Sequence, residues 1–218
     1  MSTKDLNIVL PIKDPHGAKE RLSALLTPEQ RLELAHYLID QTFSFFNGFL
    51  DRAHVLVITD SADIAQRAEA SGFTALKEDQ AEGETAAVER ATAWSVARGF
   101  RSQVVIPGDM ARINADELSQ LIDTPRPDPS VILVPAVDDD GTNAILTTPP
   151  NVIRFRFGNR SFPDYCERAA QQNVPCEVLR LPSFVLDLDT PTDLKAAVQQ
   201  GRNAQLMEML KQWQIPLT

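Results

Sequence analysis

Short apolar runs alternate with helical segments along the first half of this 218-residue chain. The runs at Leu6–Pro11, Val55–Thr59 and Val104–Ile106 are rich in β-branched residues, which is typical of strands buried on both faces. Such alternation predicts an α/β fold with a mostly parallel sheet and helices on both faces. A strand-rich stretch from 131 to 187 predicts a mixed sheet that carries a substrate lobe. No repeat or linker divides the chain, so we expect one domain over residues 1–218.

Capping residues locate several of the predicted helices. Thr27-Pro28 is typical of a helix start, and Ser61, Asn114 and Ser161 are expected to be N-caps of later helices. A helical pattern is also expected to open at Lys19. Strands are predicted at 153–157 and at 184–189, and two helical segments, 192–200 and 204–213, are expected to finish the chain.

The acidic composition limits the choice of partners. The formal net charge is −9, whereas nucleic acid and anionic membranes bind basic surfaces, so we expect neither partner. Cys166 and Cys176 are too few for a disulfide framework and lack zinc spacing, which favours reduced thiols in a cytoplasmic protein. No signal peptide and no membrane-spanning run is recognisable. The oligomeric state is left open, with a homodimer as one option.

Two predicted strand ends carry three aspartates. One strand ends in Pro107-Gly108-Asp109, and alternation within 184–189 places Asp187 and Asp189 on one face. Ligands of open α/β sheets bind beyond the carboxyl ends of strands, and Mg²⁺ prefers hard oxygen ligands. We therefore interpret Asp109, Asp187 and Asp189 as a Mg²⁺ site. The alternative is helix capping, and for Asp189 alone capping is the favoured interpretation because Asp189-Thr190-Pro191 has the pattern of a helix start.

Lys13 and Lys19 bracket a loop that leads from the first predicted strand into a helical pattern. Helix N-termini and fixed ammonium groups both attract phosphate, so this loop is a candidate phosphate site. The alternative, a solvated basic patch, is equally compatible with these residues alone.

Two further turns are candidate anion sites. Thr142 follows Asp140-Gly141 in a hairpin-like turn, and Gly158 precedes the helix predicted to start at Ser161. Backbone amides at such a helix start can hold a phosphate or carboxylate. The alternatives are a solvated turn at 138–140 and an ordinary N-cap at Ser161.

Taken together, these stretches resemble the CofC family, guanylyltransferases of deazaflavin coenzyme biosynthesis that are related to the molybdenum-cofactor enzyme MobA. The resemblance covers nearly the whole chain and implies a single-domain, Rossmann-like, MobA-type nucleotidyltransferase fold. The motifs that carry it are Pro11-Ile12-Lys13, Ala18-Lys19-Glu20-Arg21-Leu22, Pro107-Gly108-Asp109, Asp140-Gly141-Thr142-Asn143-Ala144, Phe157-Gly158 with Ser161-Phe162, and the stretch from Leu186 to Leu194.

The resemblance also implies a reaction. The phosphate of a small phospho-acid, such as 2-phospholactate, phosphoenolpyruvate or 3-phosphoglycerate, would attack GTP at its α-phosphorus and release pyrophosphate. The alternatives are a related nucleotidyltransferase with another base or acceptor, and a non-catalytic nucleotide-binding paralogue. The family pattern implies Mg²⁺ on Asp109, Asp187 and Asp189; catalytic roles for Lys13, Lys19 and Asp109; nucleotide contacts at Lys13, Lys19, Gly83, Thr85 and Gly108; and the phospho-acid at Thr142, Gly158 and Ser161.

Two stretches depart from the family pattern. Gly83-Glu84-Thr85 stands where the family has Gly-Leu-Asn, in the loop where nucleotide contacts are expected. Glu84 would either accept hydrogen bonds from guanine or weaken nucleotide binding. Met110-Ala111-Arg112 stands where the family has Leu-Pro, which adds a cation near Asp109.

Overall fold

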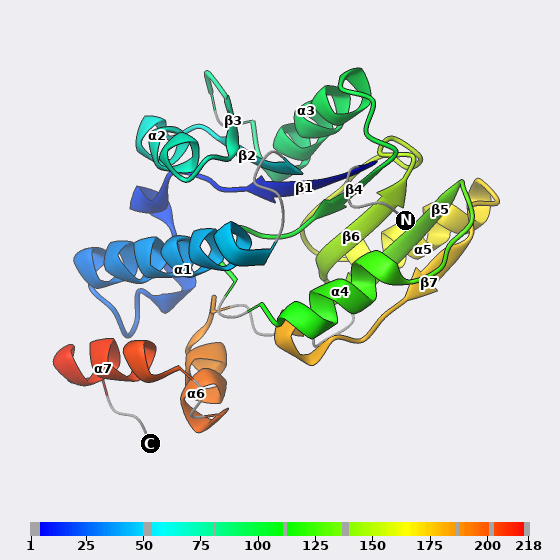
Figure 1. Ribbon diagram of the computed structural model, residues 1–218. Coiled ribbons are helices and arrows are strands. Elements are labelled where there is room, and N and C mark those ends of the chain that lie inside the picture. The colour runs from blue at the N-terminus through cyan, green and yellow to red at the C-terminus, as the bar shows by residue number, and fades with distance from the viewer. Residues whose placement is uncertain are drawn as a thin grey trace.

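The computed structural model describes residues 5–49, 54–80, 82–110, 113–136, 140–185, 188–200 and 203–215. Within these ranges the strands form one seven-stranded sheet in the order β3-β2-β1-β4-β6-β5-β7 (Figure 1). The first four in that order are parallel, β6 is antiparallel to β4 and β5, and β7 is parallel to β5. The predicted mostly parallel, mixed sheet is confirmed. The strands are β1 (Leu6–Pro11), β2 (Val55–Thr59), β3 (Thr74–Lys77), β4 (Ser102–Val105), β5 (Ser130–Pro135), β6 (Thr142–Thr148) and β7 (Cys176–Val178).

The helices follow the predicted segments closely. Ser61 and Asn114 accept hydrogen bonds from the first turns of α2 and α4, so both are N-caps as predicted. None of the helices in the described ranges combines the length and the apolar character needed to cross a membrane. The helices are α1 (Pro28–Phe49), α2 (Ala62–Ala70), α3 (Glu84–Ala97), α4 (Ala115–Asp123), α5 (Ser161–Gln171), α6 (Pro191–Gln200) and α7 (Ala204–Gln212), with short 3-10 turns η2 (Pro15–Gly17), η3 (Glu20–Leu22) and η5 (Pro182–Val185).

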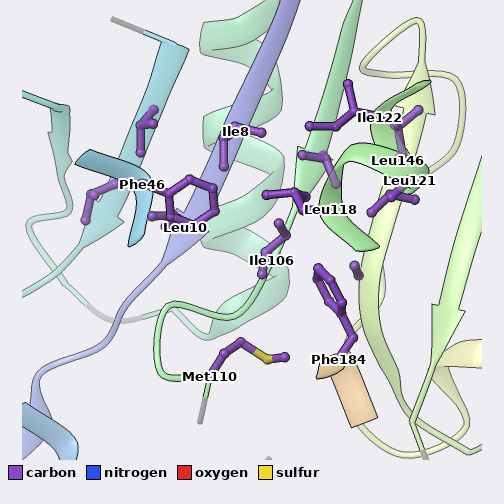
Figure 2. Close-up of a cluster of buried hydrophobic side chains, with 14 of the residues drawn as sticks. Ile8, Leu10, Phe46, Ile106, Met110, Leu118, Leu121, Ile122, Leu146 and Phe184 are labelled. Carbon is purple, nitrogen blue, oxygen red and sulfur yellow. The ribbon is translucent and has the colours of Figure 1, made fainter. Parts of the chain in front are cut away.

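The alternation of side chains along each central strand divides the core between the two faces of the sheet. Ile8 and Leu10 of β1 pack under α1, α2 and α4, whereas Val9 packs on the opposite face with α3 and α5. Figure 2 shows Ile8 and Leu10 beside Phe46 of α1, with the α4 leucines across the strand ends. Each such side chain contributes roughly 1.5–3 kcal/mol through its burial. The prediction of helices on both faces is confirmed.

A third cluster lies outside the sheet layers. Leu194 of α6 and Leu206 and Leu210 of α7 pack with Leu34 and Leu38 of α1. Figure 1 shows α6 and α7 next to α1, away from the sheet. This packing fixes the start of α6 relative to the segment that follows β1.

The segment 153–157 is not the predicted strand, although its side chains alternate between buried and exposed positions. Phe155 is buried and Arg154 and Arg156 are exposed. Its amides are bonded to side chains of the helices: the N–H of Phe155 donates to Glu89, that of Arg156 to the Tyr165 hydroxyl, and that of Phe157 to Thr85. The segment is therefore held by α3 and α5 without joining the sheet.

The predicted strand at 184–189 is also wrong in its described part, where η5 ends at Val185 and Leu188 and Asp189 belong to no strand. Phe184 is buried in the cluster under α1 and α4, whereas Leu188 is buried in the α6–α7 cluster. The alternating apolar residues are therefore explained by a segment that runs from one hydrophobic cluster to another, and not by a strand.

Candidate active site

A cavity of about 1200 Å³ lies at the carboxyl ends of the parallel strands. Segments following β1, β2, β3 and β4 line it, together with the start of β6 and the starts of α3, α5 and α6. Thr85 and Gly108 are not part of the described lining, and Asp187 lies outside the described residues. The predicted site residues that do line the cavity are Lys13, Lys19, Gly83, Asp109, Thr142, Gly158, Ser161 and Asp189.

Lys19 lies at the centre of this site, between two of the predicted metal ligands. Its Nζ is 2.7 Å from Asp109 Oδ2 and 2.8 Å from Asp189 Oδ1, and its side chain is 1% exposed. Its backbone is left-handed, with φ 58°, immediately before η3. The predicted helical pattern from Lys19 is therefore a three-residue 3-10 turn. A non-glycine residue in this conformation costs about 1–2 kcal/mol, so the two ion pairs offset backbone strain.

The start of α6 is capped by residues other than Asp189. Asp193 accepts hydrogen bonds from the amide and hydroxyl of Thr190, both at 2.7 Å, and the N–H of Asp193 donates to the Thr190 hydroxyl. This reciprocal arrangement is a capping box, with Pro191 at the first helical position. The capping interpretation of Asp189 is therefore wrong. Its carboxylate is directed to Lys19 instead.

The donor set fits a divalent cation. Asp109 and Asp189 reach the same ammonium group, and their side chains are 39% and 41% exposed, so a cation already lies between two accessible carboxylates. Hard oxygen ligands of this kind suit Mg²⁺. Among the residues that the structure describes, no group of three acidic, histidine or cysteine side chains is arranged to hold a metal. The three-aspartate Mg²⁺ site therefore stays a prediction.

Lys13 lies on a loop that other residues hold in place. The N–H of Asp14 donates to Asp60 Oδ1 at 2.8 Å, and the Asp14 carboxylate accepts the N–H of His16 at 2.9 Å. This backbone hydrogen bond is the main cause of the lowered pKa of Asp14, with the His16 side chain adding to it. The loop is thus anchored to the end of β2, which leaves the exposed Lys13 at the cavity.

Gly108 and Thr85 support the lining from behind it. A Cβ on Gly108 would overlap the buried Ile12 side chain, so glycine lets the segment after β4 pass closely against the end of β1. Thr85 accepts the N–H of Phe157 at 3.0 Å, which ties the start of α3 to the segment before α5. Their predicted nucleotide contacts remain predictions.

The amides at the start of α5 are already bonded within the protein. The N–H of Ser161 donates to Gly158 O and that of Phe162 to Asp140 O, both at 3.1 Å. The Asp140 carboxylate accepts the N–H of Arg160, which is left-handed with φ 61°. Pro163, which follows Phe162, has no N–H. The amides of residues 160–162 are therefore bonded within the protein and are not the free donors that were expected at this helix start. Ser161 is the first helical residue of α5 rather than its N-cap.

Thr142 and Ser161 lie side by side. The Ser161 hydroxyl donates to Thr142 Oγ1 at 3.2 Å, and both residues are buried. The two hydroxyls therefore form one continuous part of the cavity wall. Gly158, with φ 103°, lines the cavity next to them. The structure thus brings the three predicted phospho-acid residues together.

Two acidic lining residues were missed by the sequence analysis. Asp60 directly follows β2, and Glu78 directly follows β3. The signal that could have found them is the one that located Asp109, a polar residue at the carboxyl end of a buried parallel strand.

The chain is similar to known proteins over most of its length. The family model described as "Guanylyl transferase CofC like" matches residues 6–218. A 3-phospho-D-glycerate guanylyltransferase of Colwellia psychrerythraea is 43% identical over 189 residues, which cover 87% of this chain and 89% of the relative. A phosphoenolpyruvate guanylyltransferase of Rubrobacter xylanophilus is 29% identical over 193 residues, which cover 88% and 93%.

A solved structure from Desulfovibrio desulfuricans, assigned as a nucleotide-diphospho-sugar transferase, superposes with a TM-score of 0.72. The superposition covers 96% of both chains at 15% sequence identity. At this identity the likeness is one of fold.

Proposed function

The chain belongs to the CofC-like guanylyl transferase family, and on this premise we propose that it transfers the guanylyl group of GTP to the phosphate of a small phospho-acid. The observation that supports this most directly is the gathering of the predicted residues for both substrates around one cavity. We expect 3-phosphoglycerate to be the preferred acceptor, because the relative named for that acceptor shares 43% identity over 87% of the chain. The product would serve the assembly of a deazaflavin coenzyme.

The proposed reaction needs no nucleophile from the protein. An oxygen of the acceptor phosphate attacks the α-phosphorus of GTP and forms a new P–O bond. The bond from the α-phosphorus to the oxygen bridging to the β-phosphorus breaks, and pyrophosphate leaves with the electron pair. The protein therefore acts by positioning both substrates and by compensating charge.

The side chains of the cavity divide these tasks. Lys13, an exposed residue of the loop after β1 that lines the cavity, would contact the triphosphate. Asp109 and Asp189 would hold Mg²⁺, which when bound neutralises the charge that develops on the phosphates. Lys19 holds these two carboxylates together. Thr142, Gly158 and Ser161 form the wall against which we place the acceptor.

The test is incubation of the purified protein with Mg²⁺, each of the four ribonucleoside triphosphates, and 3-phosphoglycerate, phosphoenolpyruvate or 2-phospholactate. We expect pyrophosphate release and a diphosphate-linked guanosyl product, identified by mass, with GTP and one of the acids. Asp109→Asn is expected to form no product, whereas Glu82→Gln, which alters an exposed acid outside the described lining, should match the wild type. Nucleotide binding without pyrophosphate release for any acid would overturn the proposal.

A further inference from the structure

Glu78 is a buried acidic residue that lines the cavity and has no part in the proposed transfer of the guanylyl group. It follows β3 directly and is 6% exposed. Burial raises the pKa of its carboxyl, and the guanidinium of Arg90 opposes that rise. A hydrogen bond made to a carboxylate in so little water is stronger than one made in solvent. A ligand that donates to Glu78 would therefore be bound with high selectivity.

The contacts of Glu78 fix its position and use one of its oxygens. Oε1 accepts a hydrogen bond from Arg90 Nη1 at 3.2 Å. In the part of the chain that the structure describes, this is the one side-chain donor that reaches the carboxylate. Arg90 Nη2 also contacts Glu82 Oε2 at 2.6 Å, so the guanidinium is shared between two acids. Arg90 therefore holds Glu78 through one oxygen of its carboxylate.

The surroundings of Glu78 suit a flat aromatic base. Ile58 of β2 and Ala87 of the first turns of α3 line the same cavity, and both are buried in the cluster on the α3 side of the sheet. A purine has two apolar faces and a polar edge, which matches an apolar wall with one well-placed polar group.

The sheet order separates Glu78 from the reacting centre by a suitable span. In the sheet, β3 lies three places from β4, after which Asp109 follows. Three strand spacings amount to roughly 14 Å. A base held at Glu78 would leave room for the ribose and the α-phosphate before the two aspartates are reached.

Other acids near this end of the cavity are less suited to the same task. Asp60 Oδ1 accepts the N–H of Asp14 and so anchors the loop after β1. Glu84 is partly exposed in the first turn of α3. Glu78 is the buried acid of the described lining, and Arg90 holds it on the side of the sheet where Ile58 and Ala87 lie.

We propose that Glu78 selects guanine by accepting hydrogen bonds from the N1–H and the 2-amino group of the base. The proposal rests on the proposed transfer from GTP. Adenine has an acceptor at N1 and no 2-amino group, so the same carboxylate disfavours it. Hypoxanthine keeps the N1–H but lacks the amino group, so ITP loses one of the two hydrogen bonds.

The test compares kcat/KM for GTP and ITP in the wild type and in Glu78→Gln, with the acceptor saturating. Glutamine keeps the shape and can still accept from Arg90, but its amide cannot accept from both guanine donors at once. Loss of a hydrogen bond to a charged group predicts a fall of about 10-fold or more in the GTP-to-ITP ratio. Glu82→Gln is the matched control, because it shares Arg90 without lining the described cavity, and its ratio should stay at the wild-type value.

Each possible outcome supports or overturns the role proposed for Glu78. An equal fall in kcat/KM for GTP and ITP would assign Glu78 a structural role and overturn the proposal, as would a ratio that changes in Glu84→Gln and not in Glu78→Gln. A melting temperature for each variant shows that the comparison is made on folded protein. If the wild type transfers neither nucleotide, the proposed function fails, and equilibrium binding of GDP and IDP then tests Glu78 on its own by the same ratio.

Discussion

Replacing Lys19 by methionine removes a charge shared by Asp109 and Asp189 and keeps an apolar stem of similar length. Among the described residues the change deletes two charge-assisted hydrogen bonds, of 2.7 and 2.8 Å, from a side chain that is 1% exposed. Each such bond stabilises a fold by roughly 1.5–3 kcal/mol. Because the two carboxylates are about 40% exposed and can take up water, part of this is recovered. We expect a net loss of about 2–3 kcal/mol in the free energy of unfolding.

The assay is urea unfolding of Lys19→Met at neutral pH in excess EDTA, followed by circular dichroism. For a chain of this size the loss corresponds to a fall in Tm of roughly 4–12 °C. Lys13→Met is the matched control, since Lys13 is an exposed lysine on the same loop and its removal should change the stability by no more than about 0.5 kcal/mol. Addition of Mg²⁺ should recover more stability in Lys19→Met than in the wild type, because the metal then compensates two carboxylates that no longer share an ammonium.

The reasoning is refuted if Lys19→Met unfolds at the same urea concentration as Lys13→Met in EDTA. It is also refuted if Mg²⁺ stabilises the wild type as much as Lys19→Met. A comparison of two further variants at position 19 separates the effect of the lost charge on stability from that of backbone strain. Lys19→Gly should be more stable than Lys19→Ala, since glycine adopts the φ of 58° without the cost that alanine meets.

The remaining predictions concern the walls of the cavity. Gly108→Ala should lower the free energy of unfolding by about 1–3 kcal/mol, because the new Cβ overlaps the Ile12 side chain. In the double variant with Ile12→Ala the total loss should be smaller than the sum of the two single losses, and strictly additive losses in urea unfolding would contradict this. Asp140→Ala should cost about 1 kcal/mol by leaving the Arg160 amide without its acceptor, whereas Asp140→Asn should cost less, as thermal melts can show. Asp109→Asn should abolish turnover and remove one of the two carboxylate charges that Lys19 contacts among the described residues, so its melting temperature in EDTA should fall; a rise would show that repulsion between the two carboxylates dominates.

The strands of the sheet could be predicted because each is determined by a few residues that are neighbours in the sequence. The central strands contain short β-branched runs, and the segment that follows each strand lies at the carboxyl edge of the sheet, as Asp109 after β4 shows. Helix starts at Ser61 and Asn114 were equally local, since a cap and the amide it accepts are two or three residues apart. Predictions of this kind depend on a few neighbouring residues and need no knowledge of the rest of the chain.

The pairing of Lys19 with Asp189 could not be predicted in this way. The two residues are 170 positions apart, and the packing of α6 and α7 against α1 brings them together. The two wrong strands have the same cause. Alternating side chains at 153–157 and 184–189 record which residues are buried, but a strand also needs a free neighbouring edge, and here helices and a second core occupy the surroundings.

The charge of the cavity bears on why the proposed reaction calls for a divalent cation. Its described lining contains three cations, Lys13, Lys19 and Arg21, against eight acids, Asp14, Asp60, Glu78, Glu84, Asp109, Asp140, Asp189 and Asp193. Lys19 is committed to Asp109 and Asp189, and Asp140 and Asp193 are engaged with backbone amides of the helix starts. A triphosphate and a phospho-acid would therefore enter a cavity whose described lining offers few cationic side chains to them. We therefore propose that Mg²⁺ brought with the substrate compensates the charge at Asp109 and Asp189, and that Lys19 keeps the two carboxylates in place before the metal arrives.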